Sequence, residues 1–228
     1  MQHDLLLLSS TAVFGMQPLE FALDEVKAFL DGESTLLFVP YAKANYDDYT
    51  LGVQSILAPL GITVVGIHTA SDPRQVVETA RVLFVGGGNS FRLLKALQEH
   101  GLLATVRARV EAGEMRYMGS SAGTNMACPS LRTTNDMPIV RPISFETFGL
   151  IPFQINPHYL DPDPHSPHQG ETRAERIEEF LEENDVPVLG MREGCWLRRR
   201  ASTLTLGGVT GARLFIRSAE PREITPGT

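Results

Sequence analysis

The sequence predicts a single α/β domain, in which helices cover both faces of a mostly parallel sheet. Short apolar runs alternate with amphipathic segments through the first half of the chain, which is the pattern of consecutive β-α units. A length of 228 residues suits one large domain better than two small ones. The tail, in which Gly207-Gly208 separates alternating segments, indicates antiparallel hairpins at an edge of the sheet.

The first half of the chain supplies the parallel strands and the helices that connect them. Asp31-Gly32 is a typical C-terminal cap for a first helix, and Asn89 is a typical N-cap for a later one. Apolar periodicity predicts strands at 4–9, 35–39, 62–67 and 82–85 with a fifth leading into Ser121, and helices at 19–30, 46–60, 73–80, 91–99 and 102–112.

The second half is less regular. The alternation in the tail segments 195–206 and 212–216 predicts the antiparallel hairpins, with Arg198-Arg199-Arg200 in an exposed turn. Before the tail, we expect loops at 130–148 and 159–170, a helix at 172–183, and strands at 152–156 and 188–191.

Composition excludes several classes of protein. The net charge of −7, from 20 basic and 27 acidic side chains, argues against nucleic acid or an anionic membrane as a partner. Two cysteines in a chain of this length do not make a disulfide framework. The apolar run Leu5–Leu8 has no cationic segment before it and is too short for a signal peptide or a membrane span. We therefore expect a cytoplasmic protein, and self-association as a homodimer is left open.

The most informative segment is Gly119-Ser120-Ser121-Ala122-Gly123, a G-x-S-x-G pattern. A predicted strand precedes it and a helix of small residues follows it, which is the setting of a nucleophile elbow. The glycines allow a sharp turn, and the start of the helix directs N–H groups toward any anion that forms nearby. The pattern therefore predicts Ser121 as a nucleophile.

A serine nucleophile needs a base and an oxyanion hole, and the chain offers both after predicted strands. His158 follows the strand at 152–156, and the carboxyl ends of strands are where ligands gather in such sheets. Gly86-Gly87-Gly88-Asn89 resembles the glycine-rich oxyanion loops of esterases. We expect the N–H groups of Gly88 and Ala122 to form the hole. A dinucleotide site does not fit, because Phe91 stands where a third glycine is needed.

Two acids compete as the partner of His158, namely Asp136 and Glu193. Each of the two carboxylates also fits the alternative of a solvated side chain in a turn. His165 and His168 lie close to two aspartates, but no helix aligns them, so a polar loop fits this segment better than a metal site. The predicted chemistry therefore needs no metal and no cofactor, and activity is expected to survive chelation.

Several segments in the same order resemble peptidase E, the α-aspartyl dipeptidase family of serine peptidases. The agreement covers most of the chain and includes the segment Gln154-Ile155-Asn156-Pro157-His158. The matching segments are 5–9, 57–61, 85–89, 121–123, 127–129, 132–140, 154–158, 170–173 and 193–194.

The resemblance implies hydrolysis of dipeptides with an N-terminal aspartate, without a metal, on a fold similar to class I glutamine amidotransferases. It places the nucleophile at Ser121 and the base at His158, and its pattern supplies both Asp136 and Glu193. We expect one of these acids to orient His158 and the other to receive the substrate's ammonium group. One departure is Ser120, where the family usually shows a tryptophan.

Selection for aspartate requires a cation that faces its side-chain carboxylate. Arg173 is the candidate, because a guanidinium binds a carboxylate through two hydrogen bonds. Asn89 is the second candidate for substrate binding. Three other readings stay open: a cyanophycinase-like enzyme that cleaves β-aspartyl linkages, a general esterase, and a catalytically silent binding module of the same fold.

Overall fold

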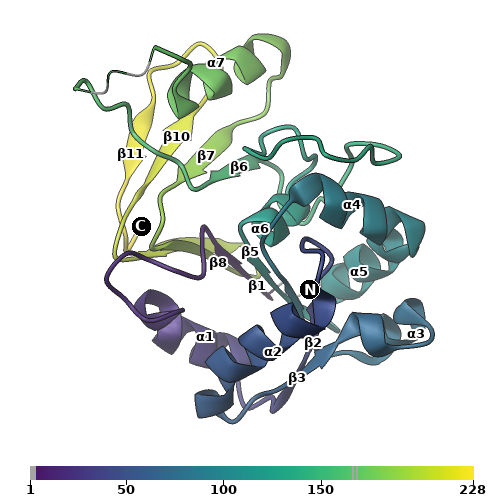
Figure 1. Ribbon diagram of the computed structural model, residues 1–228. Coiled ribbons are helices and arrows are strands. Elements are labelled where there is room, and N and C mark those ends of the chain that lie inside the picture. Colours follow the sequence, from purple (N-terminus) through teal and green to yellow (C-terminus); the bar gives the residue numbers. More distant parts are fainter. Residues whose placement is uncertain (1–3, 166, 168) are drawn as a thin grey trace.

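A seven-stranded sheet forms the centre of the molecule (Figure 1). The computed structural model describes residues 4–165, 167 and 169–228. The strands lie in the order β3-β2-β4-β5-β1-β8-β9; the first five are parallel, and β8 and β9 form an antiparallel hairpin at the edge. The predicted α/β fold with antiparallel edge strands is thereby confirmed. The strands are β1 (Asp4–Leu8), β2 (Thr35–Val39), β3 (Thr63–Gly66), β4 (Val82–Val85), β5 (Arg116–Ser120), β8 (Cys195–Arg200) and β9 (Thr203–Gly208).

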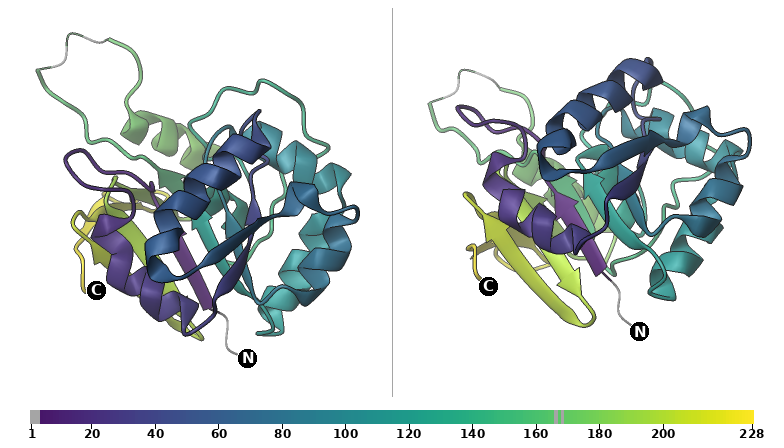
Figure 2. Two further views of the ribbon diagram at one scale, coloured as in Figure 1. Left: turned by 60° about the horizontal axis from the view of Figure 1, so that its bottom comes forward. Right: turned by 90° about the horizontal axis from the view of Figure 1, so that it is seen from below.

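Helices cover both faces of this sheet, because its parallel strands are apolar on both sides (Figure 2). Leu6 and Leu8 pack with buried residues of α1 and α2, whereas Leu5 and Leu7 belong to the core on the opposite face. The helices are α1 (Leu23–Leu30) and α2 (Tyr46–Leu57) on one face, and α3 (Pro73–Thr79), α4 (Ser90–Glu99), α5 (Leu102–Glu111) and α6 (Ala122–Ala127) on the other.

The predicted helix boundaries hold wherever a local capping signal exists. Asp31 ends α1 in the left-handed region, at φ 48°. The side-chain oxygen of Asn89 accepts a hydrogen bond of 3.0 Å from the N–H of Arg92 and so caps α4. Two predicted helices are divided, because η1 (Glu20–Ala22) precedes α1 and η2 (Ala58–Leu60) follows α2 as 3₁₀ turns; a third such turn is η3 (Ile67–Thr69).

A second, four-stranded sheet was not predicted. Its order is β11-β10-β7-β6, and only β6 and β7 are parallel. Helix α7 (Arg173–Glu183) packs on it through Ile177 and Leu181. The tail segment at 212–216 was expected at the edge of the main sheet; it pairs instead with β7, because a short apolar run specifies a strand but not its partner. The strands are β6 (Gln154–Pro157), β7 (Val188–Met191), β10 (Ala212–Phe215) and β11 (Arg222–Ile224).

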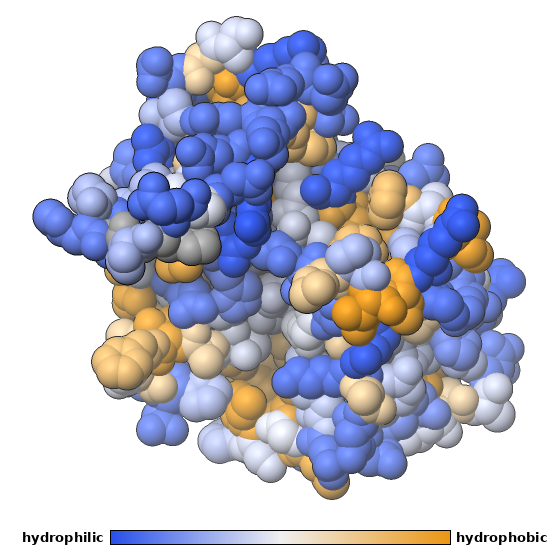
Figure 3. Space-filling view, turned by 45° about the horizontal axis from the view of Figure 1, so that its top comes forward, coloured by the Kyte–Doolittle hydropathy of each residue, from blue (hydrophilic) through white to orange (hydrophobic). Residues whose placement is uncertain are grey.

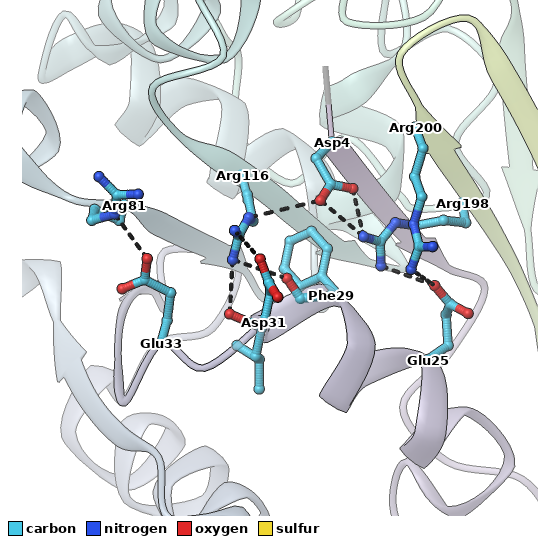
Figure 4. Close-up of polar contacts among 10 residues, drawn as sticks. Asp4, Glu25, Phe29, Asp31, Glu33, Arg81, Arg116, Arg198 and Arg200 are labelled. Carbon is cyan, nitrogen blue, oxygen red and sulfur yellow. Dashed lines mark hydrogen bonds and ion pairs between the residues drawn. The ribbon is translucent and has the colours of Figure 1, made fainter. Parts of the chain in front are cut away.

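A cluster of charged side chains joins α1 to the amino end of β1 (Figure 4). The guanidinium of Arg198 lies 2.7 Å from a carboxylate oxygen of Asp4 and 2.9 Å from one of Glu25, and it also lies over the ring of Phe29. The Arg198 side chain is only 4% exposed, so the expectation of an exposed turn was wrong at this position. The cause is β8, which pairs Arg198 with Leu6 and turns the arginine toward α1.

The surface is mostly polar. On the face drawn in Figure 3, hydrophilic side chains surround several separate hydrophobic clusters. Within the described part of the chain, no helix has both the length and the apolar character needed to cross a membrane.

Candidate active site

Ser121 lies on a sharp turn between β5 and α6. Its backbone has φ 53° and ψ −111°, a conformation that few residues other than glycine adopt. A Cβ at Gly123 would lie 2.0 Å from the carbonyl oxygen of Val85, and a Cβ at Gly119 would lie 2.6 Å from that of Gly123. Both flanking glycines are therefore required by close backbone contacts, and the turn predicted from the G-x-S-x-G pattern is present.

The turn is fixed to the central strand. The N–H of Ser121 donates to the carbonyl oxygen of Leu8 over 3.0 Å, and the hydroxyl of Thr124 donates to the same oxygen over 2.6 Å. Since Leu8 ends β1, the serine is held at the carboxyl edge of the parallel sheet, where ligands bind in folds of this kind.

His158 connects Ser121 to Glu193. Nε2 of His158 lies 2.9 Å from Oγ of Ser121, and Nδ1 lies 2.7 Å from a carboxylate oxygen of Glu193. His158 comes directly after β6, and Glu193 lies in the turn between β7 and β8. The three side chains thus form a hydroxyl–imidazole–carboxylate chain, the geometry of a serine triad. Both the imidazole and the carboxylate remain partly exposed.

Two residues that the sequence did not single out hold the backbone of His158. The hydroxyl of Ser9 accepts the N–H of His158 over 2.9 Å and donates to the carbonyl oxygen of Met191 over 2.8 Å. The side-chain amide of Asn135 donates to the carbonyl oxygen of Pro157 over 2.7 Å. Ser9 follows β1 and Met191 ends β7, so the fully buried serine ties the two sheets together beside the histidine.

The second acid, Asp136, lies in the same cleft and has a different partner. Its carboxylate accepts the N–H of Ser90, the first residue of α4, over 2.7 Å. The amino end of a helix stabilises a negative charge at this position. The geometry therefore separates the two candidates: Glu193 contacts His158, and Asp136 sits at the start of α4.

The glycine turn after β4 lies against the serine. A Cβ at Gly87 would lie 3.0 Å from Cβ of Ser121, and Gly88 has φ 133°. Among the hydrogen bonds of the described residues, neither Gly88 N–H nor Ala122 N–H has an acceptor. These are the two donors that the sequence predicts for an oxyanion hole, and their roles stay predictions.

Asn89 is already bonded through both ends of its side-chain amide. Its oxygen caps α4, and its nitrogen donates to the carbonyl oxygen of Met137 over 2.9 Å. Its backbone N–H donates to Ala42. Asn89 therefore holds the glycine turn against two neighbouring loops, and it does not line the cleft that contains Ser121.

Arg173 is the first residue of α7 and lines a hollow of about 400 Å³ beside the loop that follows His158. Burial lowers the pKa of Arg173, and Arg176 lowers it further, whereas the charge of Asp136 acts in the opposite direction. Arg173 therefore lines a hollow that shares no lining residue with the cleft of Ser121, and the charge of Asp136 favours its protonated form.

The cleft itself has a volume of about 590 Å³. Several of its residues were not predicted from the sequence, and among them are Lys43 in the loop after β2 and Tyr49 on α2. Ser120 also lines the cleft and is 2% exposed. Lys43 belongs to no sequence motif. Its position after a parallel strand is the only sequence signal that places it near the cleft. The full lining is Ser10, Thr11, Ala12, Val13, Phe14, Lys43, Tyr49, Gly87, Gly88, Ser120, Ser121, Asp136, His158 and Glu193.

Metal-ligating residues do not gather in the described part of the chain: no group of three or more histidines, cysteines, aspartates or glutamates is arranged to hold an ion there. The carboxylate of Asp161 instead pairs with Arg192 at 2.6 Å, and His165 donates its backbone N–H to Asp163. His168 lies outside the described residues.

Two solved structures share the fold of this chain, and both carry the name of a peptidase. A putative peptidase E from Listeria monocytogenes has a TM-score of 0.69 and 21% sequence identity, over 92% of this chain and 100% of that one. A peptidase from an acI-B1 actinobacterium has a TM-score of 0.72 and 18% identity, over 100% and 96%.

Closer relatives cover nearly the whole chain. Peptidase E of Streptomyces coelicolor is 59% identical over 99% of this chain and 92% of its own length. A Drosophila melanogaster protein named probable alpha-aspartyl dipeptidase is 46% identical over 98% of this chain and 94% of its own length. The family model of peptidase family S51 matches residues 5–207, a span that includes Ser121, His158 and Glu193. This chain belongs to peptidase family S51.

Proposed function

We propose that this chain is a serine dipeptidase that hydrolyses dipeptides with an N-terminal aspartate. The observation that carries the proposal is the hydrogen-bonded series from Ser121 through His158 to Glu193, which lies at the floor of a cleft large enough for a dipeptide. The names of the Streptomyces and Drosophila relatives support the substrate class.

In this proposal, the Ser121 hydroxyl attacks the carbonyl carbon of the aspartyl residue while Nε2 of His158 accepts its proton. Glu193 holds the other ring nitrogen as a donor and stabilises the imidazolium that forms. His158 then gives the proton to the departing amine. A water molecule, deprotonated by the same imidazole, releases aspartate from the acyl-enzyme and restores the serine.

The negative charge on the carbonyl oxygen needs donors that are in place before the reaction. The N–H groups of Gly88 and Ala122 serve this role in the proposal, since both are without an acceptor among the described residues; Gly88 lines the cleft with Ser121, and Ala122 follows Ser121 in the chain. Asn89 contributes indirectly, because its bonds to Ala42, Arg92 and Met137 hold the Gly88 turn.

The ends of an aspartyl residue carry opposite charges, and in the proposal an acid of the cleft and an arginine outside it bind them. Asp136 receives the α-ammonium group in the proposal, since its carboxylate lines the cleft and is not bonded to His158. Arg173 binds the side-chain carboxylate in the proposal, since its guanidinium lies at the start of α7, lines the hollow after His158 and can form two hydrogen bonds with a carboxylate.

The proposal is tested by comparing Asp-Leu, Asn-Leu, Glu-Leu and β-aspartyl-leucine at equal concentration. Hydrolysis of Asp-Leu at a rate at least about 100-fold above the other three is expected: Glu-Leu and β-aspartyl-leucine displace the reacting carbonyl by about 1 Å or more, and Asn-Leu lacks the carboxylate that pairs with Arg173. Preference for the β-aspartyl peptide would contradict the proposal and favour a cyanophycinase-like activity. Turnover of none of the four would point to a silent binding module.

A further inference from the structure

A second hollow adjoins the cleft that contains Ser121. Its volume is about 410 Å³, and Thr11, Lys43 and Tyr49 line both spaces. Because the same three residues line both spaces, the second hollow lies next to the cleft in which a substrate would bind at Ser121.

The walls of this hollow are apolar. The hollow lies along α2. The polar residues Lys43, Asn45 and Asp48 line it near the amino end of that helix. The carboxylate of Asp48, which also lines it, accepts a hydrogen bond from the Asn45 side chain and so already has a partner. The apolar lining residues are Leu19, Val53, Ile56, Leu57 and Phe84.

Lys43 is the cation at the boundary between the two spaces. Its ammonium group lies 4.8 Å from the ring centroid of Tyr49, and no carboxylate among the described residues pairs with it. The carbonyl oxygen of the preceding residue, Ala42, accepts the N–H of Asn89 over 2.9 Å and would lie 2.6 Å from a Cβ added at Gly88. The loop that carries Lys43 is therefore fixed directly to the predicted oxyanion turn.

We propose that this hollow binds the apolar side chain of the leaving residue, and that Lys43 binds that residue's α-carboxylate; the inference rests on the proposed dipeptidase function. A dipeptide places exactly these two groups beyond the scissile carbonyl. An apolar pocket favours leucine over glycine through the surface that it removes from water. An ammonium group fixed beside the oxyanion turn favours a free carboxylate over an amide.

Gly52 provides the first test, because it lines the hollow on α2 and a Cβ added there meets nothing within 4 Å. The wild-type kcat/KM for Asp-Leu is expected to exceed that for Asp-Gly by about tenfold or more. Gly52→Leu fills the space, so the ratio of Asp-Leu to Asp-Gly should fall by about tenfold, and Gly52→Ala should lower it much less. Circular dichroism and the melting temperature verify that both variants are folded.

Lys43→Met provides the second test, with Lys27→Met on α1 as the matched control. The KM for Asp-Leu should rise about tenfold or more in Lys43→Met, while that for Asp-leucinamide, which lacks the carboxylate, changes less than about twofold. Lys27→Met should leave both unchanged.

Three results decide between the hypotheses. Equal losses for Asp-Leu and Asp-leucinamide in Lys43→Met, or an unchanged Asp-Leu to Asp-Gly ratio in Gly52→Leu, would overturn the inference while the dipeptidase function stands. A wild-type protein that hydrolyses neither Asp-Leu nor Asp-Gly would overturn the proposed function, and this inference with it.

Discussion

Oγ of Ser121 lies 2.9 Å from Nε2 of His158, although the two residues follow strands of different sheets. Ser121 follows β5 of the seven-stranded sheet, and His158 follows β6 of the four-stranded one. The fully buried Ser9 joins these sheets through its bonds to His158 and Met191. The geometry of the proposed triad therefore depends on how the two sheets dock, and not on either sheet alone.

Changing each of the two acids of the cleft to its amide should impair a different kinetic parameter. Glu193→Gln is expected to lower kcat by about 10²–10⁴-fold, because the amide no longer stabilises an imidazolium on His158. Asp136→Asn should mainly raise KM, by about 10- to 100-fold, because it weakens the hold on the substrate's ammonium group. Steady-state kinetics with Asp-Leu separate the two effects. The assignment is wrong if Asp136→Asn lowers kcat and Glu193→Gln changes only KM.

Arg173 should control the preference for aspartate over asparagine. Arg173→Met is expected to reduce kcat/KM for Asp-Leu by about 10²–10⁴-fold and to bring it close to the value for Asn-Leu, because the cation that reads the carboxylate is lost. Arg176→Met, on the same helix and paired with Glu171, is the matched control and should keep the preference. If Arg173→Met still prefers Asp-Leu over Asn-Leu, another hydrogen-bond donor binds the aspartate carboxylate.

The two thiols should be inert in the folded protein. Burial raises the pKa of both Cys128 and Cys195 to about 12, so almost none of either is thiolate at pH 8. Treatment with iodoacetamide at that pH should leave activity and intact mass unchanged, whereas the same reagent in guanidinium chloride should modify both cysteines. Loss of activity in proportion to alkylation of the folded protein would indicate a cysteine in the chemistry.

Arg198 should contribute more to stability than the exposed Arg81, which belongs to a separate ion pair. Arg198→Met leaves Asp4 and Glu25 partly buried without their main partner, which costs about 3 kcal/mol of the free energy of unfolding. Arg81→Met removes an arginine that is 71% exposed and pairs with Glu33, which costs about 1 kcal/mol or less. Denaturant unfolding of both variants measures the difference. Equal losses would contradict the role of the buried pair.

Local signals in the sequence predicted much of the fold. The strands β2, β4 and β7 have the predicted bounds, because each is a short apolar run with a proline or glycine next to one end. The cap at Asn89 and the sharp turn at Ser121 follow from residue chemistry within a few positions.

What the sequence left undecided depends on contacts between distant segments. The pairing of β10 with β7 created a second sheet, and the pairing of β8 with β1 buried Arg198. The choice between Asp136 and Glu193 needed the positions of α4 and of the turn after β7. The role of Ser9 depends on the same docking of sheets, which no local pattern encodes.

The central claim is that Ser121, and not its neighbour Ser120, forms an acyl bond with the aspartyl group. Mass spectrometry of protein quenched in acid during turnover of Asp-Leu tests it directly, with Ser121→Ala and Ser120→Ala as the paired variants. In the wild-type protein we expect an aspartyl adduct on Ser121. Ser121→Ala should form no adduct and lower kcat by about 10⁴–10⁶-fold, whereas Ser120→Ala should lower kcat by about tenfold at most. An adduct on Ser120, or equal losses in the two variants, would contradict the account.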